Sequence, residues 1–207
     1  MNRRTLLLDK AEELFSEHGY EGTSIRLLAR EAGMNVAMIS YYFGSKEKLF
    51  EALVEERTSS IRERLKQMTD DSSSPMLRLE EIIRLYVDRI LHHRRFHRLL
   101  LHELSINRRP DLQERLAEVL VRNMDELRRV IRDGIEQGCF RTVDVDLTIM
   151  TLIGTVNQLI VASEVMRDKI MNNESEISDH PAVSLKDRLY RHLYDLMTTH
   201  LLINTPN

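Results

Sequence analysis

The placement of glycines in the first fifty residues constrains the fold more than any other feature of the chain. Gly19, Gly33 and Gly44 each follow a short run with apolar residues at helical spacing, and glycine is the usual residue just beyond a helix end. Asn35, two residues after Gly33, is a good N-cap. This punctuation predicts three short helices in tandem between about Thr5 and Phe43.

The rest of the chain also has a helical pattern. It has seven glycines and four prolines in 207 residues, and a strand-rich fold needs more turn-forming residues than that. Apolar residues recur at helical spacing over further segments. These segments are residues 45–65, 79–91, 95–106, 111–137, 147–170 and 184–202. The sequence therefore predicts an all-α chain of about nine helices.

Charge and cysteine content exclude some classes of protein. The net charge of −3 means that any DNA-binding surface is local. The single cysteine, Cys139, excludes an internal disulfide framework. The apolar run Leu6–Leu8 is too short for an export signal, and polar residues interrupt the apolar segment 147–162, which argues against a membrane span. We expect a cytoplasmic protein.

The second and third short helices have the layout of a helix-turn-helix, whose second helix enters the major groove of DNA. Ile39 and Phe43 are one turn apart and are expected to face the core. At about 100° per residue, the opposite face follows. It has Ala37 and Tyr41 at its centre, Met38 and Ser40 on its flanks and Tyr42 at an edge.

Three motifs occur in order in the first quarter of the chain: ELF-x-x-x-G-Y-x-x-T-S, L-A-x-x-A-G and Y-x-F-x-x-K-E-x-L. With them, the segment from Leu6 to Glu56 resembles the DNA-binding domain of the TetR family of bacterial transcriptional regulators. The resemblance implies a helix-turn-helix DNA-binding domain over residues 1–46. It implies a helical ligand-binding and dimerisation domain over residues 47–207.

The resemblance implies DNA contacts on the third helix and at the starts of the neighbouring helices. These positions are Thr23, Ser24, Arg26, Asn35, Ala37, Met38, Ser40, Tyr41, Tyr42 and Lys46. Two positions depart from the family: Ser40 stands where a tyrosine is common, and a lysine or other polar group is common near Val36. The third helix carries no Arg or Lys. We expect base readout from Arg26, Asn35 and contacts of Ala37 or Met38 with thymine methyl groups.

Several of these residues also have a purely structural interpretation. Tyr41 and Tyr42 fit a packed aromatic pair, Lys46 fits a solvated cap residue, and Arg26 fits a surface ion pair. Within the first 50 residues, seven Lys and Arg residues balance seven Asp and Glu residues. Charge alone therefore does not separate the two interpretations.

Signals in the second domain are weaker because core and pocket residues look alike in sequence. We expect a pocket for a small apolar or amphipathic molecule, with no metal and no cofactor. Its expected lining residues are Tyr86, Ile90, Leu104, Met124, Leu127 and Ile131. His93 and His97 have a spacing that metal ligands use, but a solvated helix junction is preferred, and anion binding by the neighbouring arginines stays open. Cys139 is expected to be a small buried hydrophobe rather than a redox sensor.

The segment 147–170 is apolar on nearly all sides in its first half. Such a helix needs cover on every side, and Gly154 and Ala162 permit the close approach of another helix. Together with the last helix it predicts a four-helix interface between two copies of the chain.

These observations predict a homodimeric repressor that a small molecule releases from a palindromic DNA operator. The expected partners are double-stranded DNA, the effector and a second copy of the chain, with no membrane. The alternative is a helix-turn-helix regulator that answers to a protein partner or to no ligand. An enzyme is disfavoured, because the chain has no G-x-S-x-G, P-loop, H-E-x-x-H or glycine-rich dinucleotide turn.

Overall fold

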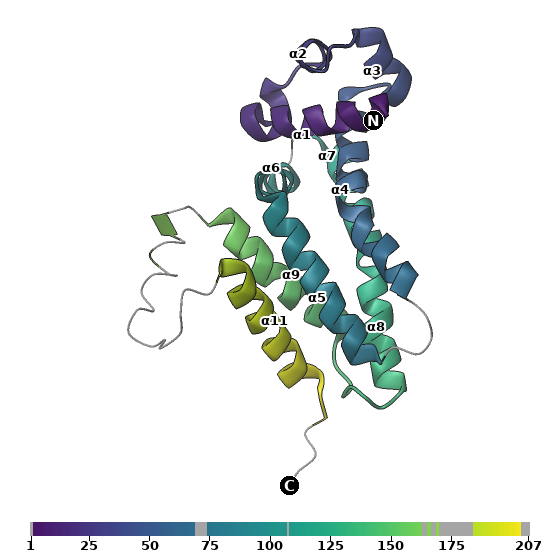
Figure 1. The fold of residues 1–207 in the computed structure, drawn as a ribbon, viewed down its shortest axis with the longest axis vertical. Helices are drawn as coiled ribbons and strands as arrows, with labels where there is room; N and C mark the ends of the chain where they lie inside the picture. Colours follow the sequence, from purple (N-terminus) through teal and green to yellow (C-terminus); the bar gives the residue numbers. More distant parts are fainter. Residues whose placement is uncertain are drawn as a thin grey trace. The chain divides into compact units, whose positions relative to one another are not determined.

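A computed structural model of the chain describes residues 2–68, 74–106, 108–162, 165–166, 169 and 184–203. The described residues are helical nearly throughout (Figure 1), so the predicted all-α class is confirmed. The helices are α1 (Arg3–Gly22), α2 (Ile25–Glu31), α3 (Val36–Phe43), α4 (Lys46–Met68), α5 (Pro75–His92), α6 (Arg94–Ser105), α7 (Pro110–Asn123), α8 (Asp125–Glu136), α9 (Val145–Val161) and α11 (Leu185–Leu201). Among the described residues, no helix is long and apolar enough to span a bilayer.

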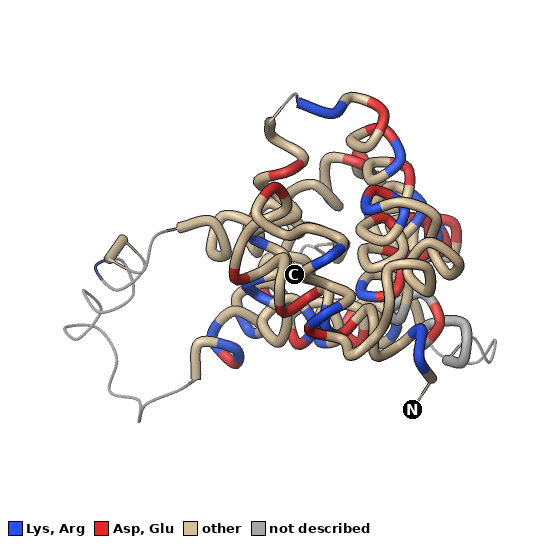
Figure 2. Tube along the Cα trace, turned by 90° about the horizontal axis from the view of Figure 1, so that it is seen from above, with Lys and Arg blue, Asp and Glu red and all other residues tan. Residues whose placement is uncertain are grey.

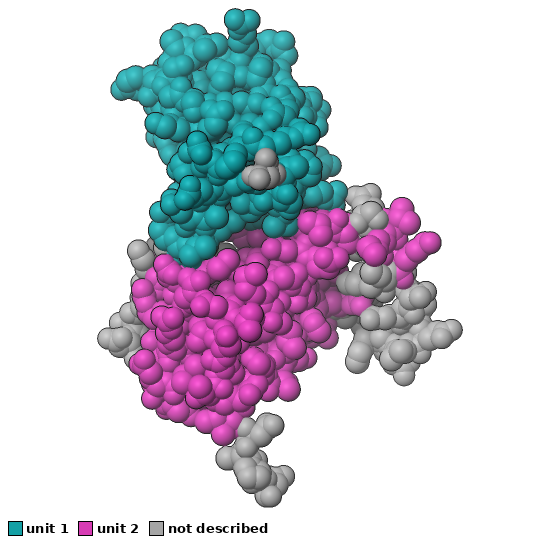
Figure 3. All heavy atoms as spheres, turned by 180° about the vertical axis from the view of Figure 1, so that it is seen from behind, with its two compact units in different colours: residues 1–62, 95–123 teal, residues 63–94, 124–207 magenta. Residues whose placement is uncertain are grey.

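The chain divides into two compact units, coloured separately in Figure 3. Unit 1 comprises residues 1–62 and 95–123, and unit 2 comprises residues 63–94 and 124–207. Unit 1 therefore contains α6 and α7 as well as the N-terminal helices. The predicted domain boundary between residues 46 and 47 concerns function, and it stays a prediction.

The core of unit 1 is continuous from α1 to α7. Phe50 of α4 lies at its centre, with its ring edge-on to Phe15 of α1 at 5.1 Å and to Phe96 of α6 at 6.0 Å between centroids. Ile39 and Phe43 of α3 belong to the same cluster. The helix α3, which is the second helix of the predicted helix-turn-helix, is thus held by a core much larger than three short helices provide. In Figure 1, α1, α2 and α3 lie together.

The core of unit 2 is built by α5, α8, α9 and α11, with α5 packed on both α8 and α11. Leu79 and Ile83 of α5 and Leu193 of α11 are fully buried. Gly134 of α8 lies directly under the ring of Phe140.

The segment that follows α8 pairs with the end of α11. Phe140 and Leu202 form an isolated antiparallel bridge. The amide of Arg141 donates to the carbonyl of Leu201 at 2.8 Å. This pairing joins the last turn of α11 to the turn after α8.

Three predicted helices differ from the observed ones. Gly19 takes non-helical angles, φ 72° and ψ 172°, so a first helical segment ends there as predicted, and a short second segment continues α1 to Gly22. The predicted helix 111–137 is divided into α7 and α8 at Met124, whose backbone keeps right-handed helical angles, φ −79° and ψ −15°. The side-chain amide of the preceding Asn123 donates to the hydroxyl of Thr58 at 2.7 Å. The end of α9 is at Val161, where Ala162 takes an extended conformation. The predicted end near Ile170 lies outside the described residues.

Candidate nucleic-acid interface

The turn between α2 and α3 is closed by backbone hydrogen bonds and a glycine. The amide of Met34 donates to the carbonyl of Ala29 at 2.8 Å, and Gly33 takes φ 62°, which side-chain-bearing residues rarely adopt. Asn35 then caps α3, its Oδ1 accepting from the amide of Met38 at 2.8 Å. The predicted helix-turn-helix and the predicted Asn35 cap are confirmed.

The helix α3 turns one face to the core and the other to solvent. Ile39 and Phe43 are 1% and 7% exposed, as their spacing predicts. The outward face consists of Val36, Ala37, Ser40 and Tyr41. Tyr41 is 84% exposed and Val36 is 41% exposed. The exposure of Val36 was missed by the sequence reasoning, because its helical angle points inward but no preceding turn covers it.

Thr23 does not reach the surface. Its side chain is fully buried, and its hydroxyl is hydrogen-bonded to the carbonyls of Leu14 at 3.0 Å and Gly19 at 2.9 Å. Ser24 is the cap of α2, with its hydroxyl oxygen accepting from the amide of Leu27 at 3.1 Å. The prediction of Thr23 as an N-cap is therefore wrong, and its contact with DNA stays a prediction. Thr23 instead ties the end of α1 to the start of α2.

The other predicted contact residues keep accessible surface, and their contact with DNA stays a prediction. Ser24, Arg26, Asn35, Ala37, Ser40 and Tyr41 are exposed, and Met38, Tyr42 and Lys46 are half-buried. Tyr41 meets the ring of Tyr42 edge-on at 5.4 Å between centroids, but its exposure rules out the packed-pair interpretation for Tyr41. Among the described residues, Arg26 has no ion-pair partner.

Charge near this surface has to be judged residue by residue. Figure 2 shows Lys and Arg interspersed with Asp and Glu along the described helices. Lys46, the first residue of α4, lies over an aromatic ring: its ammonium is 4.1 Å from the centroid of Tyr20. Burial lowers the pKa of Lys46, and the nearby Arg109 guanidinium adds to the effect. The interpretation of Lys46 as a solvated cap residue is therefore wrong.

Arg109, in the loop before α7, completes this cluster. Its guanidinium carbon is 4.2 Å from the centroid of Tyr20, and it pairs with Glu21 and with the buried Glu103. Sequence reasoning missed Arg109, because nothing in the motifs indicates that the loop after α6 meets the end of α1. The cluster links α1, α4 and the loop before α7 within unit 1.

A surface groove of about 710 Å³ lies along α4 in unit 1. Six of its charged lining residues form ion pairs with one another. The pairs are Arg115 with Glu51, Arg122 with Glu55, and Arg4 with Glu56. Because these charges neutralise each other, the groove presents little net charge to a ligand.

The predicted pocket residues are divided between the two units. Leu104 packs against the core of unit 1. Tyr86, Ile90, Met124, Leu127 and Ile131 belong to unit 2. Burial raises the pKa of the Tyr86 hydroxyl, although the Tyr86 side chain is only half-buried by its accessible surface. The assignment of these residues to a pocket stays a prediction.

The histidines and the cysteine behave differently from one another. Cys139 is exposed, so the expectation of a buried hydrophobe is wrong. Gly138, with φ 69°, turns the chain, and Phe140 enters the core instead. His97 is buried. Within the described residues, no group of three or more His, Cys, Asp or Glu side chains is placed to hold a metal ion.

Two capped helices joined by a tight turn, followed by a helical second unit, define the helix-turn-helix transcriptional regulators. The comparisons identify the family. The family model described as "Bacterial regulatory proteins, tetR family" matches residues 7–53. A second model, described as "Tetracyclin repressor-like, C-terminal domain", matches residues 72–161. The chain belongs to the TetR family of bacterial transcriptional regulators. It is a regulator and not an enzyme.

Individual relatives agree with this assignment. The chain is 25% identical to the HTH-type transcriptional regulator YhgD of Bacillus subtilis, over 74% of this chain and 80% of that protein. It is 29% identical to the repressor KstR2 of Mycobacterium tuberculosis, over 70% and 74%. The structure of FadR from Bacillus subtilis with stearoyl-CoA superposes with a TM-score of 0.75 at 19% identity, over 95% and 98%. That last likeness shows the shared fold.

Proposed function

We propose that the protein is a homodimeric repressor that binds a palindromic DNA operator and leaves it when a small ligand binds. The observation that carries the proposal is the outward face of α3, which is exposed on a capped and firmly packed helix-turn-helix. Residues 1–46 act as the DNA-binding domain and residues 47–207 as the ligand-binding and dimerisation domain. The protein works in the cytoplasm, where it meets DNA.

The proposed DNA contacts are those predicted residues that keep accessible surface. They are Ser24, Arg26, Asn35, Ala37, Met38, Ser40, Tyr41, Tyr42 and Lys46. Ser24 and Asn35 cap helices whose N-terminal amides favour phosphate. The two DNA-binding domains of one dimer require operator half-sites about one helical turn of DNA apart, roughly 34–36 Å, or a multiple of that.

The face of α9 supports a dimer through α9 and α11. Leu147 is 65% exposed and Met150 is 58% exposed, and Gly154 on the same side has no heavy atom within 4 Å of an added Cβ. An apolar helix face of this kind favours a partner. The contribution of α11 is smaller than the sequence predicts, because its leucines at 189, 193 and 201 are already buried in the protomer core.

An apolar or amphipathic ligand is the class we propose. The FadR relative was solved with stearoyl-CoA, and KstR2 is described as a ketosteroid regulator. The predicted pocket residue Tyr86 lies in unit 2 and is half-buried. In such a pocket the Tyr86 hydroxyl would supply a polar group for a ligand that is otherwise apolar.

Selection from a random duplex pool tests the proposal. Purified full-length protein is incubated with the pool at fixed salt, since affinity depends on salt, and the bound duplexes are sequenced. We expect a two-fold symmetric consensus. Failure to enrich any sequence contradicts a sequence-specific regulator.

Release of the selected duplex tests the ligand class. Stearoyl-CoA and a ketosteroid are each titrated into the protein–DNA complex, with coenzyme A as the control for stearoyl-CoA. Release by either apolar compound, but not by coenzyme A, supports the ligand class. Stable binding in the presence of both favours the alternative of a protein partner or no ligand.

A further inference from the structure

The outward face of α3 has an unusual chemistry for a recognition helix. In the major groove, guanine is read by Arg or Lys, adenine by the paired groups of Asn or Gln, cytosine by Asp or Glu, and thymine by apolar contact with its C5-methyl group. The eight residues of α3, VAMISYYF, carry no charge and no amide. The hydroxyls of Ser40 and Tyr41 donate and accept alike, so they discriminate weakly between bases.

Asn35 is the amide next to α3, and its cap limits what it can read. Its Oδ1 accepts the amide of Met38 at 2.8 Å. Two-bond recognition of adenine uses the oxygen and the nitrogen of the same amide. The cap uses one of the two lone pairs of Oδ1 and fixes the direction of the Asn35 amide, so it restricts how Asn35 can read adenine while Nδ2 keeps its donors.

Val36 occupies the position where a recognition helix meets base edges. The N-terminal residues of such a helix contact the bases, and Val36 is the first residue of α3. It is 41% exposed, and the exposed Ala37 follows it. Met38 is half-buried on the other flank. The exposed apolar groups nearest the base edges therefore belong to Val36 and Ala37.

We infer that α3 reads DNA through thymine C5-methyl groups and that Val36 is a specificity-determining residue beside Ala37. The inference rests on the proposed DNA-binding function and specifies its chemistry. Each operator half-site then contains thymine at one or more positions under the first turn of α3.

Deoxyuridine tests this inference from the DNA side. The duplex selected from the random pool is made again with single thymines replaced by deoxyuridine, which removes the methyl group and keeps every hydrogen-bonding group. Burial of one methyl-sized group contributes about 0.8 kcal/mol, so we expect about fourfold weaker binding at each contacted thymine. Thymines outside the half-sites serve as controls and are expected to show no change.

A protein variant identifies the side chain that meets the methyl group. In Val36→Ala, the same deoxyuridine replacement is expected to weaken binding less than twofold, because the valine methyl groups that contact thymine are gone. The matched control is Val121→Ala, the same change at an exposed valine of α7. This control is expected to keep the fourfold effect.

The outcomes separate the inference from the function on which it rests. A symmetric consensus without thymine under α3 overturns the inference and keeps the regulator. So does a consensus in which every deoxyuridine duplex binds within twofold of the thymine duplex. Equal deoxyuridine effects in Val36→Ala and in the unchanged protein overturn the role of Val36. A pool that yields no enriched sequence overturns the function and the inference together.

Discussion

Gly134 of α8 leaves no room for a side chain. A Cβ there would lie 2.1 Å from Cδ2 of Phe140, whose ring is 2% exposed. We expect Gly134→Ala to destabilise the protein by about 1–3 kcal/mol, because overpacking forces the ring or the helix to move. Urea unfolding measures this loss. If the ring is the cause, adding Gly134→Ala to Phe140→Leu costs less than adding it to the unchanged protein, and an equal cost contradicts that explanation.

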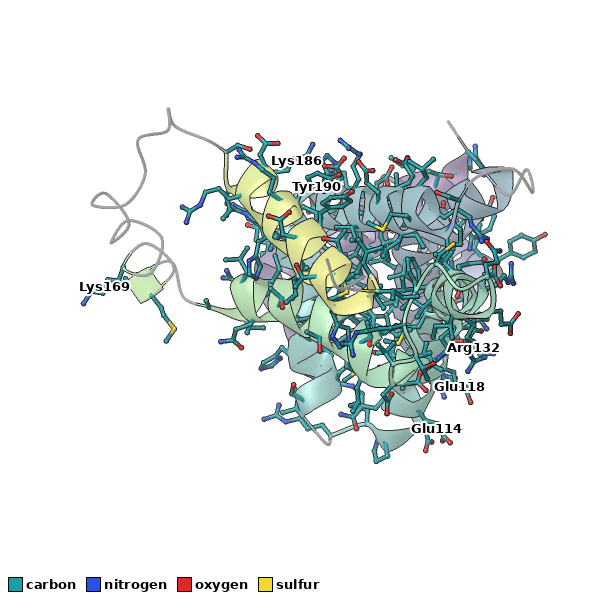
Figure 4. All side chains as sticks on the ribbon, turned by 90° about the horizontal axis from the view of Figure 1, so that it is seen from below. Glu114, Glu118, Arg132, Lys169, Lys186 and Tyr190 are labelled. Carbon is teal, nitrogen blue, oxygen red and sulfur yellow. The ribbon has the colours of Figure 1, made fainter. Side chains whose placement is uncertain are left out.

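Tyr190 of α11, labelled in Figure 4, gives the stability a dependence on alkaline pH. Its hydroxyl donates to Glu80 at 2.7 Å and accepts from Arg84 at 3.1 Å. Burial first, and then Glu80, raise the pKa of Tyr190 from 10.0 to about 12. Since the folded state holds this proton more tightly than the unfolded chain, the stabilisation is present below pH 10 and is lost as the pH rises towards about 12.

The corresponding variant is Tyr190→Phe, which has no proton to lose. Its free energy of unfolding is expected to fall less steeply above pH 10 than that of the unchanged protein. Tyr20 and Tyr86 also have raised pKa values, and they are present in both proteins and cancel in the comparison. Identical slopes above pH 10 would show that Tyr190 is not responsible.

Arg26 on α2 is expected to read a base. Arg26→Ala should then relax the preference at one operator position and weaken binding of the preferred duplex by about 1–3 kcal/mol. Competition between duplexes that differ at single base pairs measures the change. The control is Arg30→Ala on the same helix, where Arg30 pairs with Glu31. Equal weakening on all duplexes, with a salt slope reduced by about 1, would assign Arg26 to a phosphate instead.

At the scale of single elements, variants at the cap of α3 distinguish an effect on stability from an effect on DNA binding. Asn35→Ala removes the acceptor for the amide of Met38 and is expected to cost about 1 kcal/mol. Asn35→Asp keeps the cap and is expected to preserve stability, but it should weaken DNA binding because it places a negative charge beside the phosphates. Thermal unfolding and a DNA titration on both variants check this. Full DNA binding by Asn35→Asp would place Asn35 away from the DNA.

Elements with strong local signals are those that the sequence predicts well. Asn35, Gly33 and Gly44 mark the ends of α2 and α3 by backbone chemistry that acts within a few residues. The choice between Thr23 and Ser24 as the cap of α2 is different, because both are good cap residues. It is decided by the carbonyls of Leu14 and Gly19, which occupy the hydroxyl of Thr23. The break at Met124 is likewise missed, because no glycine or proline marks it.

At the scale of the whole molecule, the exposed face of α9 should decide the oligomeric state. Leu147→Glu places a charge on a 65% exposed apolar residue. We expect the proposed dimer to dissociate and DNA affinity to fall at least tenfold, because two linked DNA-binding domains bind far more tightly than one. Sedimentation velocity measures the first effect and a DNA titration the second. The control is Val121→Glu on α7, and an unchanged dimer in Leu147→Glu would exclude this face.

Contacts between distant segments are the part that sequence alone does not reach. The family resemblance implies a DNA contact at Lys46, and Tyr20 belongs to the first motif, but Arg109 joins them from a loop whose sequence carries no such signal. The ligand is likewise not predictable from the sequence, because the residues expected to line its pocket have the ordinary composition of a helical core. The outward face of α3 is predictable apart from Val36, because helical periodicity describes the middle of a helix better than its first turn.

The pairing of Phe140 with Leu202 has a genetic consequence. A premature stop codon removes every residue that follows it. Here the loss of residues from position 201 onward would remove the fully buried Leu201 together with the bridge that holds Phe140. A nonsense allele at this point should therefore behave as a null allele, with the loss of the proposed repression.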